Sequence, residues 1–267
     1  MAGMLTSESP ATRLGLALSG GVARGPAHLG VLKALHAAQV PVACVSGSSA
    51  GAIAGAIYCA GASLAKVEAD LATFNWWRIA RPVWPRRGLM SFARLEDWLT
   101  GLIGPLTLAD LPVPLAIVAT DLETGEPVTL REGPVARAVH ASCAVPGWVE
   151  PVRWDGRWLG DGGISNNLPV RAARALGAEV VAGVDLFRPK LRLSWGALGF
   201  GAAAMEHLVR RSGGGLEDAD ILICPELAGA GYFRFNKRES LIALGVAATD
   251  AALPTIRAAL AQPVRLV

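Results

Sequence analysis

The chain has 267 residues, of which 52% are hydrophobic and 18% charged, and its formal net charge is +3. This composition excludes an intrinsically disordered chain, and the weak basicity, with arginines confined to a few segments, gives little support to nucleic-acid binding. A chain of this length buries roughly three quarters of its unfolded surface, so its stability requires neither a metal nor a disulfide.

The organisation of the chain is expected to be simple. Residues 1–12 are predicted to form a flexible tail with no signal peptide, and residues 13–267 a single domain, because no repeat or clear linker divides them. No apolar stretch reaches the roughly 20 residues of a spanning helix, so we expect at most peripheral membrane contact. Reduced core thiols and a cytoplasmic location are expected from the absence of C-x-x-C pairs among Cys44, Cys59, Cys143 and Cys224.

Two strand–turn–helix units open the chain. Residues 13–19 form an apolar run that leads through a Gly-rich turn at 20–25 into a helix. A second apolar strand, residues 40–45, leads through small residues at 46–51 into an Ala/Ile-rich helix. Two such units in succession predict an α/β fold with a central, mostly parallel sheet flanked by helices on both faces.

Shorter apolar runs predict the remaining strands. A hairpin turn is expected at 123–126 and another turn at 155–156, and a terminal helix is expected from about 239 to 260 despite Pro254. The expected strands are 114–121, 128–130, 149–154, 179–185 and 220–224.

A tryptophan- and arginine-rich segment with two prolines, residues 75–94, predicts an exposed flap. Trp76, Trp77 and Arg78 are candidate contacts with a membrane surface or the substrate, because Trp favours the bilayer interface and Arg pairs with lipid phosphates. A solvated, partly packed loop is the alternative interpretation.

The pentapeptide Gly47-Ser48-Ser49-Ala50-Gly51 has the G-x-S-x-G form of a nucleophile elbow, in which a serine occupies a strained strand-to-helix turn. Ser49 is therefore a candidate nucleophile, and the helix after it adds positive potential near a developing oxyanion. The alternative is a turn of small residues in which Ser49 serves only as a helix N-cap.

A Gly-rich segment forms the turn of the first unit, and its N–H groups can converge on an anion ahead of a helix. It lacks the lysine and hydroxyl residue of a P-loop, and its adjacent glycines do not match the dinucleotide-binding pattern. We therefore expect an oxyanion hole, with a tight turn that binds nothing as the alternative. The segment is Gly20-Gly21-Val22-Ala23-Arg24-Gly25.

A catalytic serine needs a proton acceptor, usually histidine. Each histidine of the chain falls in a predicted helix and is expected to be surface-exposed or packed: His28, His36, His140 and His207. The candidate base is instead Asp161, which precedes Gly162 and Gly163 in a predicted loop, although Asp-Gly-Gly alone is often an ordinary turn. Because the ordinary aspartate pKa lies near 3.9, burial would have to raise it.

These three motifs, in this order, resemble those of the patatin-like phospholipase family, especially its short bacterial members. The resemblance implies a patatin-like three-layer arrangement, with Ser49 as nucleophile and Asp161 as base of a dyad without histidine, and it implies no metal or cofactor. It also implies that residues 20–25 form the oxyanion hole. Val22 stands where the family pattern most often has a third glycine, so we expect the hole to form differently or less well.

The function expected from the resemblance is hydrolysis of lipid acyl esters, of the phospholipase A or lysophospholipase type, through an acyl-enzyme. A thioesterase or acyltransferase acting through the same dyad, and a non-catalytic acyl-binding regulatory protein, are the alternatives. Neither the head group, the acyl length nor the oligomeric state follows from these motifs.

Overall fold

The computed structural model describes residues 12–187, 189, 193–227 and 237–261. Apart from Thr12, the predicted flexible tail of residues 1–12 lies outside the described residues. The assignment of residues 13–267 to a single domain stays a prediction.

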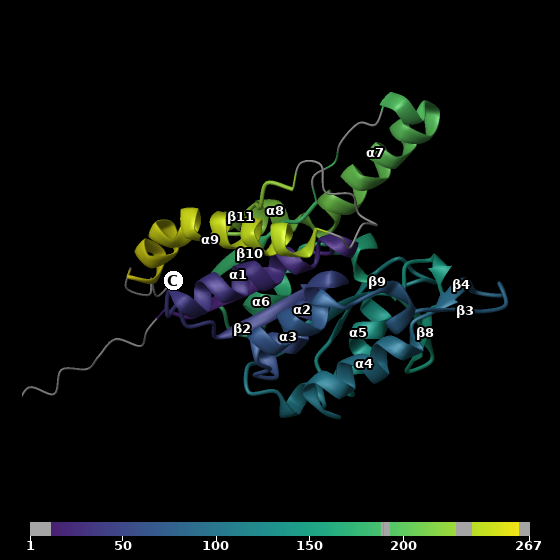
Figure 1. The fold of residues 1–267 in the computed structure, drawn as a ribbon, viewed down its shortest axis with the longest axis horizontal. Helices are drawn as coiled ribbons and strands as arrows, with labels where there is room; N and C mark the ends of the chain where they lie inside the picture. The colour runs from purple at the N-terminus through teal and green to yellow at the C-terminus, as the bar shows by residue number, and fades with distance from the viewer. Residues whose placement is uncertain (1–11, 188, 190–192, 228–236, 262–267) are drawn as a thin grey trace, which may run out of the picture.

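An eight-stranded sheet runs through the centre of the molecule (Figure 1). Five parallel strands follow one another in the order β11, β10, β1, β2 and β5, and the antiparallel strands β9, β8 and β6 continue the sheet from β5. The predicted mostly parallel sheet is thereby confirmed. The strands are β1 (Leu14–Leu18), β2 (Cys44–Ser48), β5 (Leu115–Asp121), β6 (Pro127–Leu130), β8 (Val152–Trp154), β9 (Arg157–Asp161), β10 (Val180–Val184) and β11 (Ile221–Ile223).

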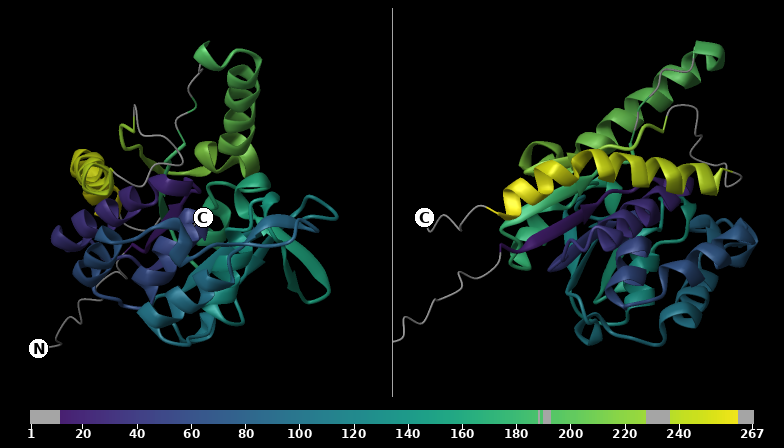
Figure 2. Two further views of the ribbon diagram at one scale, coloured as in Figure 1. Left: turned by 45° about the vertical axis from the view of Figure 1, so that its right-hand side comes forward. Right: turned by 60° about the vertical axis from the view of Figure 1, so that its left-hand side comes forward.

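Helices cover both faces of this sheet (Figure 2). A small second sheet, of β3 (Arg81–Pro82), β4 (Gly88–Ser91) and β7 (Gly147–Val149), projects from the body. The α-helices are α1 (Pro26–Ala37), α2 (Ala50–Cys59), α3 (Leu64–Ala72), α4 (Ala93–Ile103), α5 (Val135–Ser142), α6 (Val170–Ala175), α7 (Ala197–Arg211), α8 (Gly215–Asp218) and α9 (Arg238–Leu260). The 3-10 helices are η1 (Val22–Arg24), η2 (Trp76–Arg78), η3 (Leu108–Asp110), η4 (Gly162–Ile164), η5 (Leu193–Trp195) and η6 (Ser212–Gly214).

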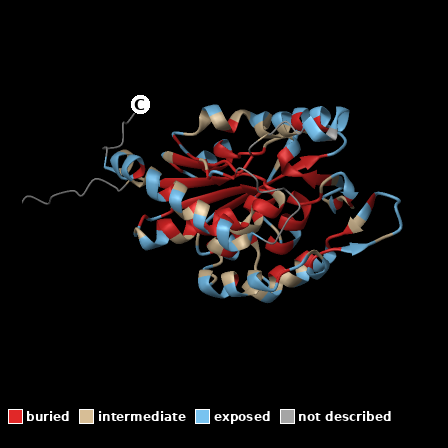
Figure 3. Cartoon of the chain, turned by 45° about the horizontal axis from the view of Figure 1, so that its top comes forward, coloured by how far each residue is buried: buried red, intermediate tan, exposed pale blue. Residues whose placement is uncertain are grey.

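Side chains of β1 alternate between two hydrophobic cores. Leu14, Leu16 and Leu18 belong to the larger core, which also holds side chains of α1, α2, α5 and α9. Ala17 belongs to a smaller core on the other face, together with Val170 of α6. Because helices cover both faces, the central strands are apolar throughout, and Figure 3 shows them buried while exposure concentrates on the outer helices.

The terminal helix α9 confirms the prediction of a helix at 239–260 and includes Pro254. Within the described ranges it alone is long and apolar enough to cross a membrane, by length and composition only. It packs closely along α1: a Cβ at Gly245 would lie 2.1 Å from the Ala27 carbonyl oxygen, and one at Gly30 would lie 2.0 Å from that of Ile242. One face of α9 is thus held tightly against α1, although only 28% of its most apolar stretch is buried.

Two strands differ from their predicted bounds. Strand β2 covers Cys44–Ser48 instead of 40–45, because Ser46 and Gly47 pair with a strand on each side and Ser48 pairs with β5, and the turn shrinks to Ser49 alone. The predicted strand 149–154 is divided between β7 and β8, and it breaks beside Pro151, which has no N–H for a sheet hydrogen bond. The turns at 123–126 and 155–156 are confirmed, since β5 and β6, and β8 and β9, form antiparallel hairpins.

Candidate active site

Strand β5 brings two distant parts of the chain together. Its Val118 pairs with Ser48 of β2, and the next residue, Ala119, pairs with Asp161 of β9. Strand β6 pairs with β5 across residues 117–120 and so overlaps both partners. Because a strand has only two edges, β2 and β9 must share the other edge, and β9 lies where β2 ends. The end of β2 therefore lies beside Asp161.

Ser49 and Asp161 are in direct contact. The Ser49 Oγ donates a hydrogen bond of 2.6 Å to the Asp161 Oδ2, and the two residues are 7% and 8% exposed. Ser49 occupies the position before α2, but its side chain makes no capping hydrogen bond to that helix. The alternative interpretation of Ser49 as a mere helix N-cap is therefore wrong.

The backbone of the elbow is strained and closely packed. Ser49 has φ 52° and ψ −119°, which places a non-glycine residue at positive φ. A Cβ at Gly47 would lie 2.5 Å from the Gly51 carbonyl oxygen, and one at Gly51 would lie 2.1 Å from that of Leu18. The outer glycines of the pentapeptide are thus required for close approach. Between them, Ser48 ends β2 and Ala50 begins α2.

Ser142, which the sequence analysis did not identify, holds this strained turn. Its Oγ accepts a hydrogen bond of 2.8 Å from the Ser49 N–H and donates one of 2.6 Å to the Val118 carbonyl oxygen. Ser142 ends α5 and is fully buried. No motif marks it, because a single serine in an Ala-rich helix has no sequence signature.

Asp161 is the last residue of β9, not part of a flexible loop as predicted, and η4 follows it directly. The Gly163 N–H donates to Asp161 Oδ1 at 2.8 Å, and Gly162 lies between them. Burial raises the pKa of Asp161 to about 6, against the opposing effect of the hydrogen bonds from Ser49 and Gly163. The carboxylate is thus a stronger base than an exposed aspartate.

The Gly-rich segment lies against the elbow. A Cβ at Gly20 would lie 3.4 Å from the Ser49 Cβ, and one at Gly25 would lie 3.4 Å from the Ala50 Cβ. The Gly20 N–H donates to the Asn167 Oδ1 at 3.1 Å, while the N–H groups of Arg24 and Gly25 donate to backbone oxygens of the segment itself. The N–H groups that have no protein acceptor among the described residues are those of Gly21, Val22 and Ala23.

Val22 has φ 49°, the left-handed conformation that glycine would favour. For a β-branched residue this conformation costs roughly 1–2 kcal/mol. Its side chain lines the cavity described below. The position at which the sequence departs from the family pattern is thus a point of real backbone strain.

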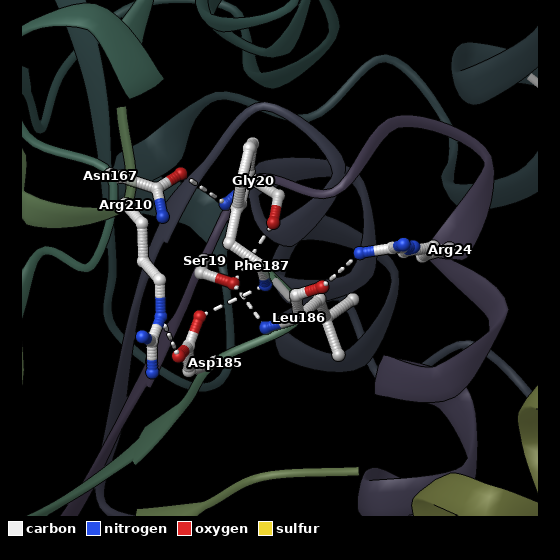
Figure 4. Close-up of polar contacts among 8 residues, drawn as sticks. All are labelled: Ser19, Gly20, Arg24, Asn167, Asp185, Leu186, Phe187 and Arg210. Atoms are coloured by element: carbon white, nitrogen blue, oxygen red, sulfur yellow. Dashed lines mark hydrogen bonds and ion pairs between the residues drawn. The ribbon is translucent and has the colours of Figure 1, made fainter. Parts of the chain in front are cut away.

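Polar contacts hold the Gly-rich segment against the chain after β10 (Figure 4). The buried Arg24 side chain donates to the Leu186 carbonyl oxygen at 3.0 Å. The Leu186 N–H donates to the Ser19 Oγ at 2.9 Å, and that hydroxyl donates to the Gly20 carbonyl oxygen at 2.9 Å. Arg24 therefore braces the segment with its side chain.

An apolar cavity of about 140 Å³ begins at Ser49 and extends between α1, α2, α3 and α4. An apolar cavity of comparable volume in another protein stays dry and binds small apolar molecules. Cys143 also lines it, and burial, reinforced by the Asp161 charge, raises the pKa of that thiol well above its usual value. Its walls include Leu29, Leu32, Ile53, Ile57, Phe74 and Trp98.

The three candidate surface residues of η2 have different environments. Trp76 is half-buried, lines the cavity and packs against Phe92 with ring centroids 5.8 Å apart. Trp77 is exposed, whereas Arg78 forms an ion pair of 2.9 Å with Asp70. Trp76 therefore lies on the cavity side and Trp77 faces solvent, so the three do not share one surface.

The histidines have other partners or are exposed. His28 Nε2 lies 2.8 Å from the Ser19 carbonyl oxygen, and burial lowers the His28 pKa to about 4. His140 Nδ1 pairs with Glu96, and His36 and His207 are exposed. Over the described part of the chain, no group of three or more His, Cys, Asp or Glu side chains is placed to hold a metal ion.

All four cysteines lie within the described residues, and Cys44, Cys59 and Cys143 are buried.

Known proteins resemble this chain in sequence. A family model described as patatin-like phospholipase matches residues 16–174. An uncharacterised NTE family protein of Mycobacterium tuberculosis is 36% identical over 182 residues, 67% of this chain and 50% of that protein. Human patatin-like phospholipase domain-containing protein 6 is 34% identical over 181 residues, 65% of this chain and 13% of that protein. The chain thus spans about half the length of the mycobacterial relative.

Two solved structures share the fold. VipD from Legionella pneumophila matches with a TM-score of 0.54 at 17% identity, over 92% of this chain and 68% of that chain. The type III effector protein ExoU matches with a TM-score of 0.52 at 17% identity, over 92% of this chain and 54% of that chain.

Proposed function

The chain belongs to the patatin-like phospholipase family, and on that premise we propose that it is a serine hydrolase of lipid acyl esters, of the phospholipase A or lysophospholipase type. The observation that carries the proposal is the 2.6 Å hydrogen bond from Ser49 Oγ to Asp161 Oδ2, at the start of an apolar cavity. A nucleophile within hydrogen-bond reach of a base is the arrangement that acyl transfer requires.

In the proposed first step, the Ser49 Oγ attacks the ester carbonyl carbon while its proton passes to the Asp161 Oδ2. A pKa of about 6 leaves Asp161 mostly ionised at neutral pH yet raises its affinity for the proton. The positive φ of Ser49 and its hydrogen bond from the backbone to Ser142 support a preorganised nucleophile.

The negative charge of the tetrahedral intermediate needs nearby donors. The N–H groups of Gly21, Val22 and Ala23 are proposed for this role, since they have no protein acceptor within the described ranges and their segment packs against Ser49. The N-terminus of α2, which begins at Ala50, adds positive potential. The backbone N–H of Arg24 already donates to the Gly21 carbonyl oxygen, so Arg24 contributes instead through its side chain, which braces the segment.

The cavity is proposed to hold the acyl chain. Its apolar walls favour a hydrocarbon chain over a polar head group, which would remain on the solvent side of Ser49. Asp161 gives the proton taken from Ser49 to the oxygen of the leaving alcohol, which departs and leaves an acyl group on Ser49. A water molecule then gives a proton to Asp161 and attacks the acyl carbon, and Asp161 returns the proton to the Ser49 Oγ as the fatty acid is released. We further propose a cytoplasmic protein that meets its substrate at a membrane surface.

The experiment is chemical labelling followed by turnover. We expect a fluorophosphonate probe to label the protein at Ser49, and Ser49→Ala to abolish both labelling and p-nitrophenyl ester hydrolysis. Ser46→Ala is the matched control: Ser46 is a buried serine of β2, the strand that ends just before Ser49, and its Oγ donates to the Pro169 carbonyl oxygen.

An active Ser49→Ala variant would contradict the proposal. Folded protein that binds fatty acid but is not labelled would indicate acyl binding without catalysis. If labelled protein passes its acyl group to an acceptor other than water, or prefers thioesters, the transferase or thioesterase alternative holds.

A further inference from the structure

Helix α7 stands away from the body of the molecule (Figures 1 and 2). Its buried residues are the small Gly199 and Ala203. Four large apolar side chains of this helix are more than half exposed: Leu198, Phe200, Met205 and Leu208. A helix in the interior of a protein would bury these side chains. Their exposure here indicates a surface that binds something outside the described residues.

The charged residues of α7 lie in its C-terminal part. No charged residue occurs from Ala197 to Met205, whereas Glu206 follows directly and Arg210 and Arg211 occupy the last turn. Apolar side chains on one part of a helix with arginines beside them are typical of helices that bind at the surface of a lipid bilayer. Arg211 matches the anionic head groups of such a surface.

The C-terminal end of α7 is bonded to two segments near the site, the chain after β10 and the turn after Asp161. Arg210 Nε pairs with Asp185 Oδ2 at 2.8 Å, and Asp185 directly precedes Leu186, which holds the Gly-rich segment (Figure 4). Beyond the helix, the Ser212 Oγ donates to the Gly163 carbonyl oxygen at 2.9 Å. The orientation of α7 is thus set by the same residues that build the site.

We propose that α7 is a docking arm, which inserts its exposed apolar side chains into the surface of a bilayer containing anionic phospholipid. The choice of partner rests on the proposed function, because a lipid hydrolase must meet its substrate at such a surface. Trp77, Trp84 and Trp148 are also exposed and belong to the segments around the small sheet, which projects on the right-hand side of Figure 1 together with α7. Interfacial tryptophans fit the same surface.

The binding test uses the Ser49→Ala protein, so that turnover does not enter the measurement. We expect Leu198→Gln combined with Met205→Gln to lower partition onto vesicles of phosphatidylcholine with a minor fraction of phosphatidylglycerol by about tenfold or more. Arg211→Gln should lower partition only when phosphatidylglycerol is present. Leu222→Gln, at an exposed leucine of β11, is the control and should leave partition unchanged.

The catalytic test uses the active protein with the same two α7 substitutions. Hydrolysis of a soluble p-nitrophenyl ester should stay within about twofold of the unsubstituted protein, while hydrolysis of vesicle phospholipid should fall about tenfold. Because vesicle partition is measured without turnover, a failure of the proposed function would leave the docking result intact.

Equal partition by the α7 variant and the control would overturn the inference. So would a protein that is dimeric in sedimentation and becomes monomeric on substitution while its vesicle partition stays the same. That outcome would assign the exposed face of α7 to a second copy of the chain.

Discussion

The turn around Ser49 and the helix α7 differ in how their side chains are buried and bonded. Ser49 and Asp161 are less than a tenth exposed and bonded to each other, and the elbow holds a non-glycine residue at positive φ. In α7, large apolar side chains remain in solvent, while Arg210 in its last turn and Ser212 just beyond it are bonded to the body of the molecule. Strain and buried charge persist only where neighbouring groups compensate them, whereas exposed apolar surface is left for a partner.

If this comparison is right, changes around Ser49 that remove a donor or acceptor of the site alter turnover of every substrate, while changes in α7 alter only turnover of substrate held in a bilayer. Four predictions test the first half of that statement, and they are ordered from the largest expected effect to the smallest.

Asp161→Asn should lower kcat by about a thousandfold or more, because the amide cannot accept the Ser49 proton. It should also stabilise the protein above pH 6. The pKa of Asp161 rises from 3.8 to about 6 on folding. The free energy of unfolding is therefore unaffected by this group below pH 3.8, and it falls by about 3 kcal/mol as the pH rises through 6. Urea unfolding should show the variant to be more stable at about pH 8, with the gap closing at about pH 3.5. Equal stability at both pH values would contradict the burial of a charge.

Ser142→Ala should lower kcat by about 10- to 100-fold with little change in KM, because it removes the acceptor of the Ser49 N–H and the donor to Val118. Leaving these two buried groups unpaired should also destabilise the protein by about 1–3 kcal/mol. Ser46→Ala, which removes another buried hydroxyl that donates a hydrogen bond, provides the control. Equal kcat in the two variants would show that Ser142 does not position the nucleophile.

The pH profile of the unsubstituted protein should show kcat/KM falling below about pH 6, by about tenfold per pH unit, as Asp161 becomes protonated. His28, with a pKa lowered to about 4 by burial, does not titrate in this range. A soluble ester is the appropriate substrate, since vesicle binding has its own pH dependence. An acid limb near pH 4 would indicate a carboxylate with an ordinary pKa and would contradict its burial.

Val22→Gly should have the smallest effect. It relieves the positive φ at that position but increases the backbone freedom of the unfolded chain, and the two effects offset to within about 1 kcal/mol. Turnover should be retained, because the backbone N–H remains. Thermal unfolding with ester hydrolysis checks both points, and a loss of activity beyond about tenfold would show that the valine side chain itself is needed at the cavity.

The sequence predicted the parts of the molecule that depend on local chemistry. Short apolar runs predicted the central strands because both faces of the sheet are covered, and small residues predicted a tight turn at Ser49. The bounds were less well predicted: β2 includes Ser46 and Gly47, whose small side chains suggested a turn but suit a strand pressed between neighbours. Asn167 follows the Asp-Gly-Gly motif in the sequence, but nothing in the sequence predicted that it accepts a hydrogen bond from the Gly20 N–H.

The sequence by itself determined that Ser49 would occupy a strand-to-helix turn and that no histidine was suitably placed to serve it, because these follow from residue type and near neighbours. Only the tertiary structure decided that Asp161 lies 2.6 Å from it, since that contact depends on β2 and β9 sharing one edge of β5. The raised pKa of Asp161, the bond from Ser49 to Ser142 and the exposed face of α7 are likewise properties of packing. Each of them depends on how residues far apart in the chain pack together, and a local sequence pattern does not determine such contacts.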